Sequence, residues 1–197
     1  MRCIFATNNE HKLEEMKEIM EHWPLELISL KEAGINLDVE ETGSSYVENA
    51  LIKARAIKEL TELPVLSDDS GMSVDALDGG PGIYSARFGG EDLPFPEKRK
   101  MIIELVREEK NRSAQFHCAV VLSMEGREYV GQGLVEGIIA EEERGEGGFG
   151  YDAIFELPSG KTFSEISAAE KHELSHRKRA VMDLESTLRD DSHSSLF

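Results

Sequence analysis

Two long strand-like stretches joined by a tight turn are the feature that most constrains the fold. Residues 114–124 and 129–139 are rich in apolar residues, and Glu125-Gly126-Arg127 between them is a hairpin signal. Upstream, short apolar runs alternate with stretches in which apolar residues recur at helical spacing. The other expected strands are 3–6, 25–28 and 64–66, and the expected helices are 13–23, 44–60, 96–109 and one that begins near 175. This order predicts an α/β protein with a mixed sheet, neither purely parallel nor an all-β barrel.

The balance of charges restricts the class of ligand. The 22 basic and 39 acidic side chains give a net charge of −17, which repels nucleic-acid phosphates and anionic lipid surfaces at long range. We therefore expect neither a nucleic-acid nor a membrane partner. A small anionic ligand requires that lysines, arginines, backbone amides or a metal ion converge in one place.

Length and cysteine content bear on domain organisation and compartment. The 197 residues suffice for one domain, 1–197, with one core or two lobes, and the tail 190–197 is expected to fray. Cys3 and Cys118 lie in apolar strand-like stretches without zinc-ligand spacing, so we expect buried, reduced thiols. The N-terminus has no signal-peptide pattern and no stretch approaches membrane-spanning length, so we expect a cytoplasmic protein.

Two cationic positions are candidates for binding phosphate. The turn Thr7-Asn8-Asn9-Glu10-His11-Lys12 lies between a strand end and a helix start, where free amides and the helix dipole favour an anion. The alternative is an N-capping turn with a solvated lysine. Lys53 shares a helical stripe with Ala50 and Ile57, so it needs an anionic partner unless it extends past the stripe to solvent.

Neighbouring carboxylates are candidates for metal chemistry. Asp68 and Asp69 follow the expected strand 64–66, Ser70 comes after them, and Glu41 supplies a further carboxylate upstream. Ligand sites of α/β sheets lie at strand ends, and adjacent strand residues point to opposite sides, so one aspartate is expected to face the site. Hard oxygen ligands without nearby thiolates suit Mg²⁺ or Mn²⁺. The alternative is an Asx-type turn with a capping aspartate.

The C-terminal half offers groups that suit a nucleotide base. A glycine-rich run is followed by Phe149-Gly150-Tyr151-Asp152, which presents an aromatic face and a carboxylate. Aromatic faces on such loops are used to stack on bases. The alternative is that these aromatic residues, which precede a strand, serve in packing. Arg177 shares a stripe of the last helix with Val181 and Leu184, so its guanidinium points inward, either to a ligand or to a buried ion-pair partner. Lys171 is compatible with an ordinary surface residue.

Together these motifs resemble the inosine triphosphate pyrophosphatase family, the non-canonical purine nucleoside triphosphate pyrophosphatases. The match extends from the first strand to the last helix. It is carried by Thr7-x-Asn9-x-x-Lys12, Glu41-Thr42-Gly43, Glu48-Asn49-Ala50-x-x-Lys53-Ala54, Asp68-Asp69-Ser70-Gly71, Pro81-Gly82-Ile83-Tyr84-Ser85-Ala86-Arg87, Gly147-Gly148-Phe149-Gly150-Tyr151-Asp152 and Ser175-His176-Arg177.

The resemblance implies an elongated α/β fold in which a mixed central sheet is flanked by helices and two lobes surround a nucleotide-binding cleft. It also implies a homodimer. Glu41 and Asp69 are the expected metal ligands, and Asp69 is the expected catalytic proton acceptor, with Asp68 as the alternative. The expected substrate-binding residues are Thr7, Asn8, Asn9, Lys12, Lys53, Ser70, Phe149, Gly150, Tyr151, Asp152, Lys171, His176 and Arg177.

The activity that the resemblance implies is hydrolysis of ITP, dITP or XTP to the monophosphate and pyrophosphate. Water would attack the α-phosphorus while a metal ion and lysines neutralise the leaving pyrophosphate. Hypoxanthine and xanthine carry an acceptor oxygen where adenine carries an amino donor, so an Arg177 directed at that oxygen would disfavour adenine by about 1–3 kcal/mol. The alternatives are a related pyrophosphatase with a pyrimidine or modified-nucleotide preference, and a nucleotide-sensing module without turnover.

Overall fold

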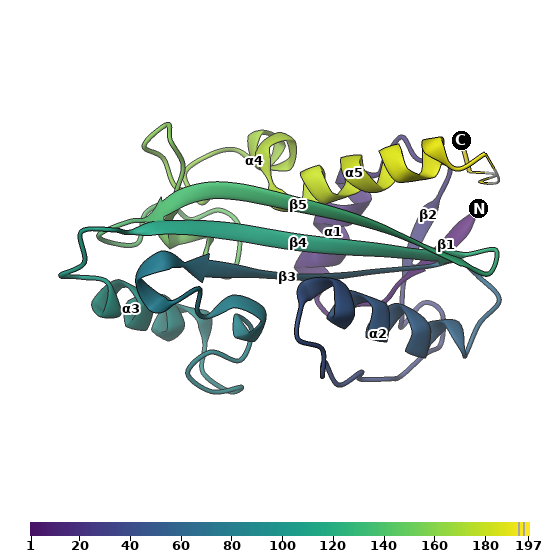
Figure 1. The fold of residues 1–197 in the computed structure, drawn as a ribbon, viewed down its shortest axis with the longest axis horizontal. Helices are drawn as coiled ribbons and strands as arrows, with labels where there is room; N and C mark the ends of the chain where they lie inside the picture. Colours follow the sequence, from purple (N-terminus) through teal and green to yellow (C-terminus); the bar gives the residue numbers. More distant parts are fainter. Residues whose placement is uncertain (193, 195) are drawn as a thin grey trace. The chain divides into compact units, whose positions relative to one another are not determined.

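A six-stranded mixed sheet and five α-helices make up the computed structural model, which describes residues 1–192, 194, 196 and 197 (Figure 1). The strands are β1 (Arg2–Phe5), β2 (Glu26–Ser29), β3 (Val65–Val74), β4 (Ser113–Met124), β5 (Arg127–Ile139) and β6 (Phe155–Glu156). The helices are α1 (Glu10–Ile19), α2 (Tyr46–Lys58), α3 (Phe95–Leu105), α4 (Ala168–Leu174) and α5 (His176–Asp190), with short 3₁₀ helices at Asp75–Leu77, Gly82–Tyr84 and Asp152–Ile154. Within the described residues, none of the helices is long and apolar enough to cross a membrane.

The strand order confirms the predicted mixed sheet. The order is β2-β1-β3-β4-β5-β6, in which β1 is parallel to both β2 and β3 whereas β5 and β6 are antiparallel. Glu125 and Gly126 join β4 to β5 with positive φ values of 53° and 74°, the left-handed conformation that two-residue hairpin turns require. The predicted hairpin is therefore also confirmed.

The chain divides into two compact units. The first unit comprises residues 1–69, 118–133 and 176–197, and the second comprises residues 70–117 and 134–175. Strands β3, β4 and β5 contribute residues to both units. A single domain over residues 1–197 stays a prediction, and the expected frayed tail 190–197 falls partly on residues 193 and 195, which lie outside the described residues.

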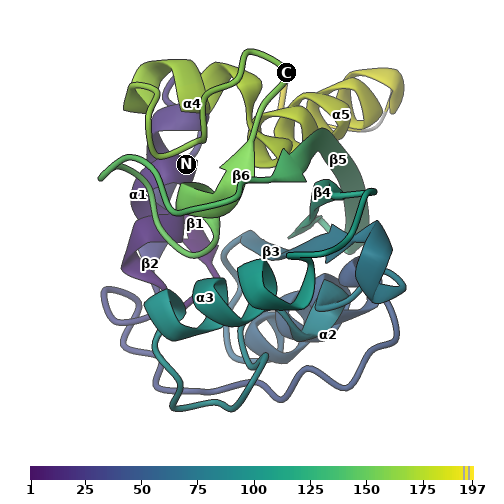
Figure 2. The same cartoon turned by 90° about the vertical axis from the view of Figure 1, so that its left-hand side faces the viewer.

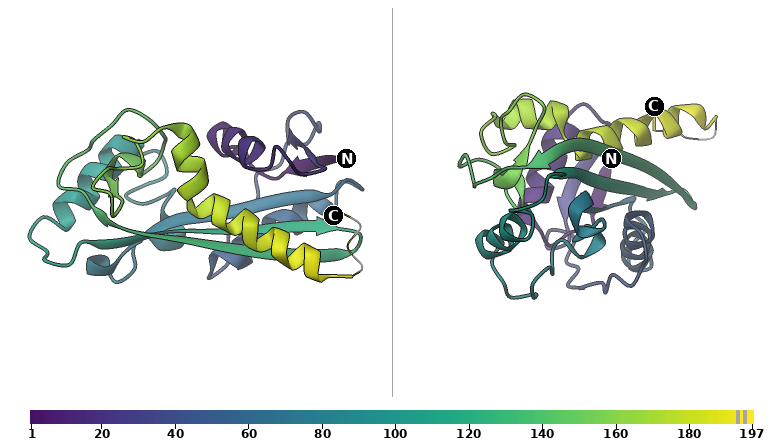
Figure 3. Two further views of the ribbon diagram at one scale, coloured as in Figure 1. Left: turned by 90° about the horizontal axis from the view of Figure 1, so that it is seen from above. Right: turned by 60° about the vertical axis from the view of Figure 1, so that its left-hand side comes forward.

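In the first unit, helices cover both faces of the sheet (Figure 2). Cys3 and Phe5 of β1 belong to an apolar cluster that includes residues of α1 and α5, whereas Ile4 belongs to a cluster that includes residues of α2. Successive side chains of a strand point to opposite faces, so a strand buried on both faces reads as a continuous apolar run. Helix α5 runs along the strands (Figure 3), with its Ala180 and Leu184 backbone against Gly131 of β5.

The second unit has its own apolar core. Ile102 of α3 belongs to it together with residues from the ends of β3, β4, β5 and β6 that lie in this unit. Three aromatic rings form its centre, with ring centroids 4.5 Å apart for Phe116 and Phe155 and 5.4 Å apart for Phe155 and Phe163. This core supports the loops that precede and follow β6.

The expected end of the third strand was wrong. The apolar run predicts a strand at 64–66 that ends before Asp68, but β3 continues to Val74 and carries both aspartates within it. The polar side chains are compatible with a buried strand because each has a partner: the hydroxyl of Ser67 donates to the Ala50 carbonyl at 2.6 Å, and the two aspartates bind groups on neighbouring helices. A buried polar group that is hydrogen-bonded does not interrupt a strand.

Candidate functional site

The turn before α1 is an N-capping turn, but its lysine is not solvated. Asn9 caps the helix by accepting a hydrogen bond from the Lys12 amide at 3.2 Å, and the Asn9 amide donates to Thr7 Oγ1 at 3.1 Å. Asn8 is exposed. Lys12 Nζ lies 3.2 Å and 3.1 Å from the two carboxylate oxygens of Asp68. The turn thus combines the capping geometry with an inward-pointing cation.

Asp68 and Arg177 form a buried charge network. Nε and Nη2 of Arg177 each lie 3.4 Å from Asp68 Oδ2, and Nη1 donates to the carboxylate of Glu15. Only 1% of Arg177 is exposed. Burial alone would raise the pKa of Asp68, but the charges of Lys12 and Arg177 outweigh burial and hold that pKa below its usual value. The buried ion pair that was one alternative for Arg177 is present, and its contact with a base stays a prediction.

Asp69 is held from the opposite side of the strand. Its Oδ2 accepts a hydrogen bond at 3.0 Å from Nδ2 of the fully buried Asn49 on α2. The Oδ1 atom of Asn49 in turn accepts a hydrogen bond from the Gly43 amide at 2.8 Å, which connects the Glu41-Thr42-Gly43 segment to α2. Burial raises the pKa of Asp69, and the charge of Glu41 adds to that shift while Lys53 opposes it. Lys53 donates to the Glu41 carboxylate, so this lysine has the anionic partner that a core-facing position requires.

The carboxylates of Glu41 and Asp69 fit a hard divalent cation in chemistry and charge. They repel each other, since Glu41 raises the pKa of Asp69, and a cation between them would remove that repulsion. In the described part of the chain, no three His, Cys, Asp or Glu side chains are grouped closely enough to hold a metal ion. Two carboxylates match a cation such as Mg²⁺, which takes most of its ligands from phosphate and water.

The second unit holds a compact group around Asp152. Asp152 is only 4% exposed. Its carboxylate accepts hydrogen bonds from the Phe149 amide at 2.8 Å and from Lys171 Nζ at 2.7 Å. The ammonium group of Lys171 also lies 4.6 Å from the centroid of the Phe149 ring. Lys171 is therefore buried and paired, unlike an ordinary surface lysine. The Tyr151 hydroxyl donates to the Ser85 carbonyl at 2.8 Å.

The expected site residues fall into two groups, one in each unit. In the first unit, Lys12, Asp68 and Arg177 are linked by ion pairs, as are Lys53 and Glu41. The buried side chain of His176 begins α5 beside Arg177. The second unit contains Phe149, Gly150, Tyr151, Asp152 and Lys171, together with the half-buried Ser70 of β3.

Two residues that bind expected site residues, Glu15 and Asn49, were not themselves among the expected site residues, although the sequence holds a signal for each. Glu15, the partner of Arg177, follows Lys12 by three residues and precedes Ile19 by four, so it shares their inward face of α1. Asn49 precedes Lys53 by four residues and shares its face of α2. Helical spacing to an inward-pointing cation is the signal that identifies both.

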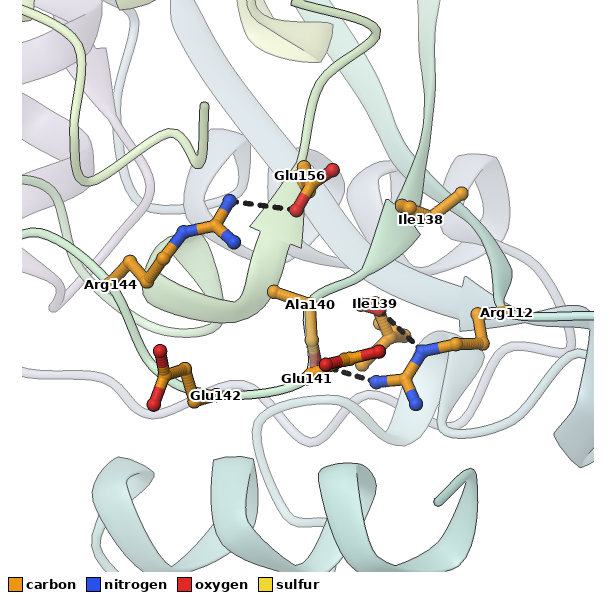
Figure 4. A pocket seen from close by; sticks show the side chains of 8 residues that line it. All are labelled: Arg112, Ile138, Ile139, Ala140, Glu141, Glu142, Arg144 and Glu156. Atoms are coloured by element: carbon orange, nitrogen blue, oxygen red, sulfur yellow. Dashed lines mark hydrogen bonds and ion pairs between the residues drawn. The ribbon is translucent and has the colours of Figure 1, made fainter. Parts of the chain in front are cut away.

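A pocket of about 500 Å³ in the second unit contains none of the expected site residues (Figure 4). Its two guanidinium groups serve the fold. Arg112 donates to the carbonyls of Ile139 at 2.8 Å and Ala140 at 2.6 Å, and Arg144 pairs with Glu156 at 2.7 Å. Because these donors are engaged by the chain itself, the pocket offers no strong anion site.

Comparisons with known proteins agree with the motifs. The Ham1 family model matches residues 3–187. A dITP/XTP pyrophosphatase from Bacillus subtilis is 42% identical over 190 residues, which cover 94% of this chain and 96% of that protein. A solved HAM1 protein from Coxiella burnetii has a TM-score of 0.87 at 38% identity, covering 97% of this chain and 100% of its own. The Staphylococcus aureus Ham1 protein has a TM-score of 0.85 at 37% identity, covering 96% and 98%. The resemblance inferred from the motifs is confirmed, and the chain belongs to the Ham1 family.

Proposed function

We propose that the protein hydrolyses the non-canonical purine nucleoside triphosphates ITP, dITP and XTP to the monophosphate and pyrophosphate. The observation that carries this chemistry is that the Glu41 and Asp69 carboxylates lie close to Lys12 and Lys53. The charges of Glu41, Lys12 and Lys53 all act on the pKa of Asp69. Acidic and basic groups in one place suit a metal-assisted reaction of a polyphosphate. The substrate class is supported by relatives of nearly full length that are named dITP/XTP pyrophosphatases.

In this mechanism the lysines bind phosphate oxygens, together with the backbone amides that begin α1. Lys12 and Lys53 are paired with Asp68 and Glu41. Binding phosphate would thus exchange one anionic partner for another, and neither largely buried ammonium group would be left unpaired. Asp69, oriented by the Asn49 amide, would accept the proton of the water that attacks the α-phosphorus.

Glu41 and Asp69 are the proposed ligands of a divalent metal ion. We propose Mg²⁺, with Mn²⁺ as the alternative, because both ligands are hard carboxylate oxygens. When bound, the ion would neutralise charge on the phosphates. Separation of Glu41 from Lys53 would then free one residue for the metal and the other for phosphate.

Base and sugar recognition is assigned to the other expected residues. Phe149, Tyr151 and Asp152 with Lys171 offer an aromatic face, an acceptor and a donor. For His176 and Arg177 we keep the prediction that they address the six-oxo group, although the Arg177 guanidinium is engaged by Glu15 and Asp68 in the structure. Contact with a base would require one of those bonds to open.

We further propose that the active form is a homodimer in the cytoplasm and that it has no nucleic-acid or membrane partner. The net charge of −17 supports the absence of polyanionic partners. Sedimentation velocity would test the dimer by comparing the mass with the 22.0 kDa of one chain.

One assay tests the activity and the substrate class together. The protein is incubated with ITP, XTP, dITP, GTP and ATP, with and without Mg²⁺, and the products are identified. We expect pyrophosphate and monophosphate from ITP, XTP and dITP only when the metal is present. Hydrolysis of ATP at an equal rate, or release of orthophosphate, would contradict the proposal. Binding without turnover would indicate a nucleotide sensor.

A further inference from the structure

Arg99 joins helix α3 to both ends of a glycine-rich loop in the second unit. Its Nη1 donates to the Gly150 carbonyl at 2.8 Å, and its Nη2 donates to the Glu143 carboxylate at 2.8 Å. The residues between these two contacts, 143–150, are called the glycine loop below. Only 15% of the Arg99 side chain is exposed. One planar guanidinium thus fixes two points of the loop with a defined geometry.

The glycine loop needs such a tie because its backbone has little rigidity of its own. Gly145, Gly148 and Gly150 adopt positive φ values of 85°, 69° and 61°. Glycine loses more conformational freedom on ordering than any other residue, so external contacts must hold the loop in place. One such contact is the Gly147 amide, which donates to the Ser164 carbonyl at 3.0 Å, and Arg99 supplies two more from the side of α3.

The glycine loop leads directly into the group proposed to hold the base. Phe149 lies within the loop, and the Gly150 carbonyl that Arg99 binds is two residues before Asp152. The Phe95 ring, also on α3, lies edge-on to Tyr151 with centroids 5.3 Å apart. The first turns of α3 therefore contact Gly150 at the end of the loop and Tyr151 immediately after it. We expect a shift of Arg99 to move the Phe149 ring and the Asp152 carboxylate together.

Arg99 is poorly placed if stability is its only role. Its Nε is buried and has no hydrogen-bond partner in the part of the chain that the structure describes. A buried donor without a partner is energetically unfavourable, because it has lost its hydrogen bonds to water without gaining others. The guanidinium makes its two loop contacts in an orientation that leaves Nε without a partner. Such an unfavourable arrangement is typical of a residue that serves a functional site.

We propose that Arg99 is a positioning residue for base recognition, which fixes the glycine loop so that Phe149 and Asp152 meet the base in one geometry. This inference rests on the proposed function and adds a specificity-determining residue to it. Arg99 itself need not touch the substrate.

Kinetics of matched variants test the inference. Arg99→Ala removes both contacts, Glu143→Ala removes one, and Arg99→Lys keeps a charge that can reach one partner. Lys100→Ala is the control, because Lys100 lies next in α3 and forms an exposed pair with Glu97. For Arg99→Ala we expect KM for ITP to rise about tenfold, the equivalent of one lost interaction of about 1.4 kcal/mol, with kcat within about twofold. The preference for ITP over ATP should fall as well.

The other variants decide between positioning and general structural damage. Glu143→Ala and Arg99→Lys should give intermediate KM values, and Lys100→Ala should match the parent protein. An Arg99→Ala protein that is folded and has unchanged KM and base preference overturns the inference, as does one that loses only kcat. If Arg99→Ala does not fold, unchanged base preference in both Glu143→Ala and Arg99→Lys overturns it. Failure of the parent protein to release pyrophosphate from ITP or XTP would instead contradict the proposed function.

Discussion

Asp68 and Asp69 are neighbours in β3 with opposite surroundings. Asp68 faces two cations, Lys12 and Arg177, whereas Asp69 accepts a hydrogen bond from the neutral amide of Asn49. Removing a buried carboxylate that balances cations leaves those charges uncompensated, which is strongly destabilising. A carboxylate bound to an amide can be replaced by an isosteric amide at a smaller cost. Substitution of Asp68 is therefore expected to affect mainly stability, and substitution of Asp69 mainly the reaction.

We predict that Asp68→Asn lowers the free energy of unfolding by about 3–5 kcal/mol, whereas Asp69→Asn changes it by less than about 1 kcal/mol. Asp69→Asn should instead lower turnover of ITP by about 10² to 10⁴, the usual contribution of a general base. Urea unfolding and pyrophosphate release measure the two effects, and each variant is the control for the other. Near-normal turnover of Asp69→Asn would remove it as the proton acceptor. A stable but inactive Asp68→Asn would move that role to Asp68.

Gly148 lies directly against the carboxylate of Asp152. A Cβ at this position would lie 2.2 Å from Asp152 Oδ2, and φ is +69°. We predict that Gly148→Ala displaces Asp152 from Lys171 and raises KM for ITP at least severalfold. Gly160→Ala is the matched control in the same unit, because φ there is +81° but nothing lies within 4 Å of the added Cβ. Both variants bear the left-handed strain of about 1–2 kcal/mol, so an equal rise in KM for both would contradict the prediction.

Single residues of the site were predictable from the sequence, but most of their partners were not. Lys53 and Arg177 lie on apolar helical stripes, and a charged group on such a stripe requires a partner of opposite charge or a ligand. The structure provides each with an anionic partner. The identity of the partner depends on tertiary structure: Glu15 and Arg177 are 162 residues apart in the chain. No local spacing relates two such residues. Their pairing follows only when α1 and α5 pack together in the first unit.

At the level of elements, β5 is shaped to receive α5. A Cβ on Gly131 would lie 2.2 Å from the Ala180 carbonyl oxygen, and one on Gly133 would lie 2.0 Å from the His176 carbonyl oxygen. The backbones approach so closely that no side chain fits between them. Gly133 therefore sets the position of the helix start, where His176 and Arg177 lie.

We predict that Gly133→Ala destabilises the protein by about 1–3 kcal/mol, the usual cost of overpacking, and lowers ITP turnover because the first turn of α5 must move. Gln132→Ala is the control on the same strand, since Gln132 is exposed and only its backbone amide bonds to Asp183. Thermal unfolding followed by circular dichroism and pyrophosphate release are the measurements. A Gly133→Ala protein as stable and active as the control would show that α5 tolerates the shift.

The sequence predicted elements best where apolar periodicity alone determines them. The central hairpin and helix α2 follow their patterns closely, with α2 at Tyr46–Lys58 inside the expected 44–60. Strand β3 was underestimated because its second half is polar and buried, and only its partners make that arrangement stable. Helix α4 was missed although Ser167 and Glu170 form a capping box before it, a signal that is readable in the sequence.

At the scale of the whole molecule, the two thiols link stability to pH. Cys3 and Cys118 are free and buried in the first unit, which confirms that both are buried and reduced. Burial raises the pKa of each thiol from 9.0 to about 12. In the unfolded chain they ionise near the ordinary value, so the folded protein retains two protons that the unfolded chain loses above pH 9.

We predict that the free energy of unfolding falls as pH rises from about 9 towards 12. Each proton bound only by the folded state contributes a slope of about −1.4 kcal/mol per pH unit, so the two thiols together contribute up to about −2.7. Urea unfolding at pH 7 to 10.5 measures the slope, and the Cys3→Ala/Cys118→Ala double variant is the control. Burial also raises the pKa of Tyr46 and Tyr151, but these residues act equally in both proteins, so the difference between the slopes reports the thiols. Equal slopes above pH 9 would show that both thiols ionise in the folded protein as readily as in the unfolded chain.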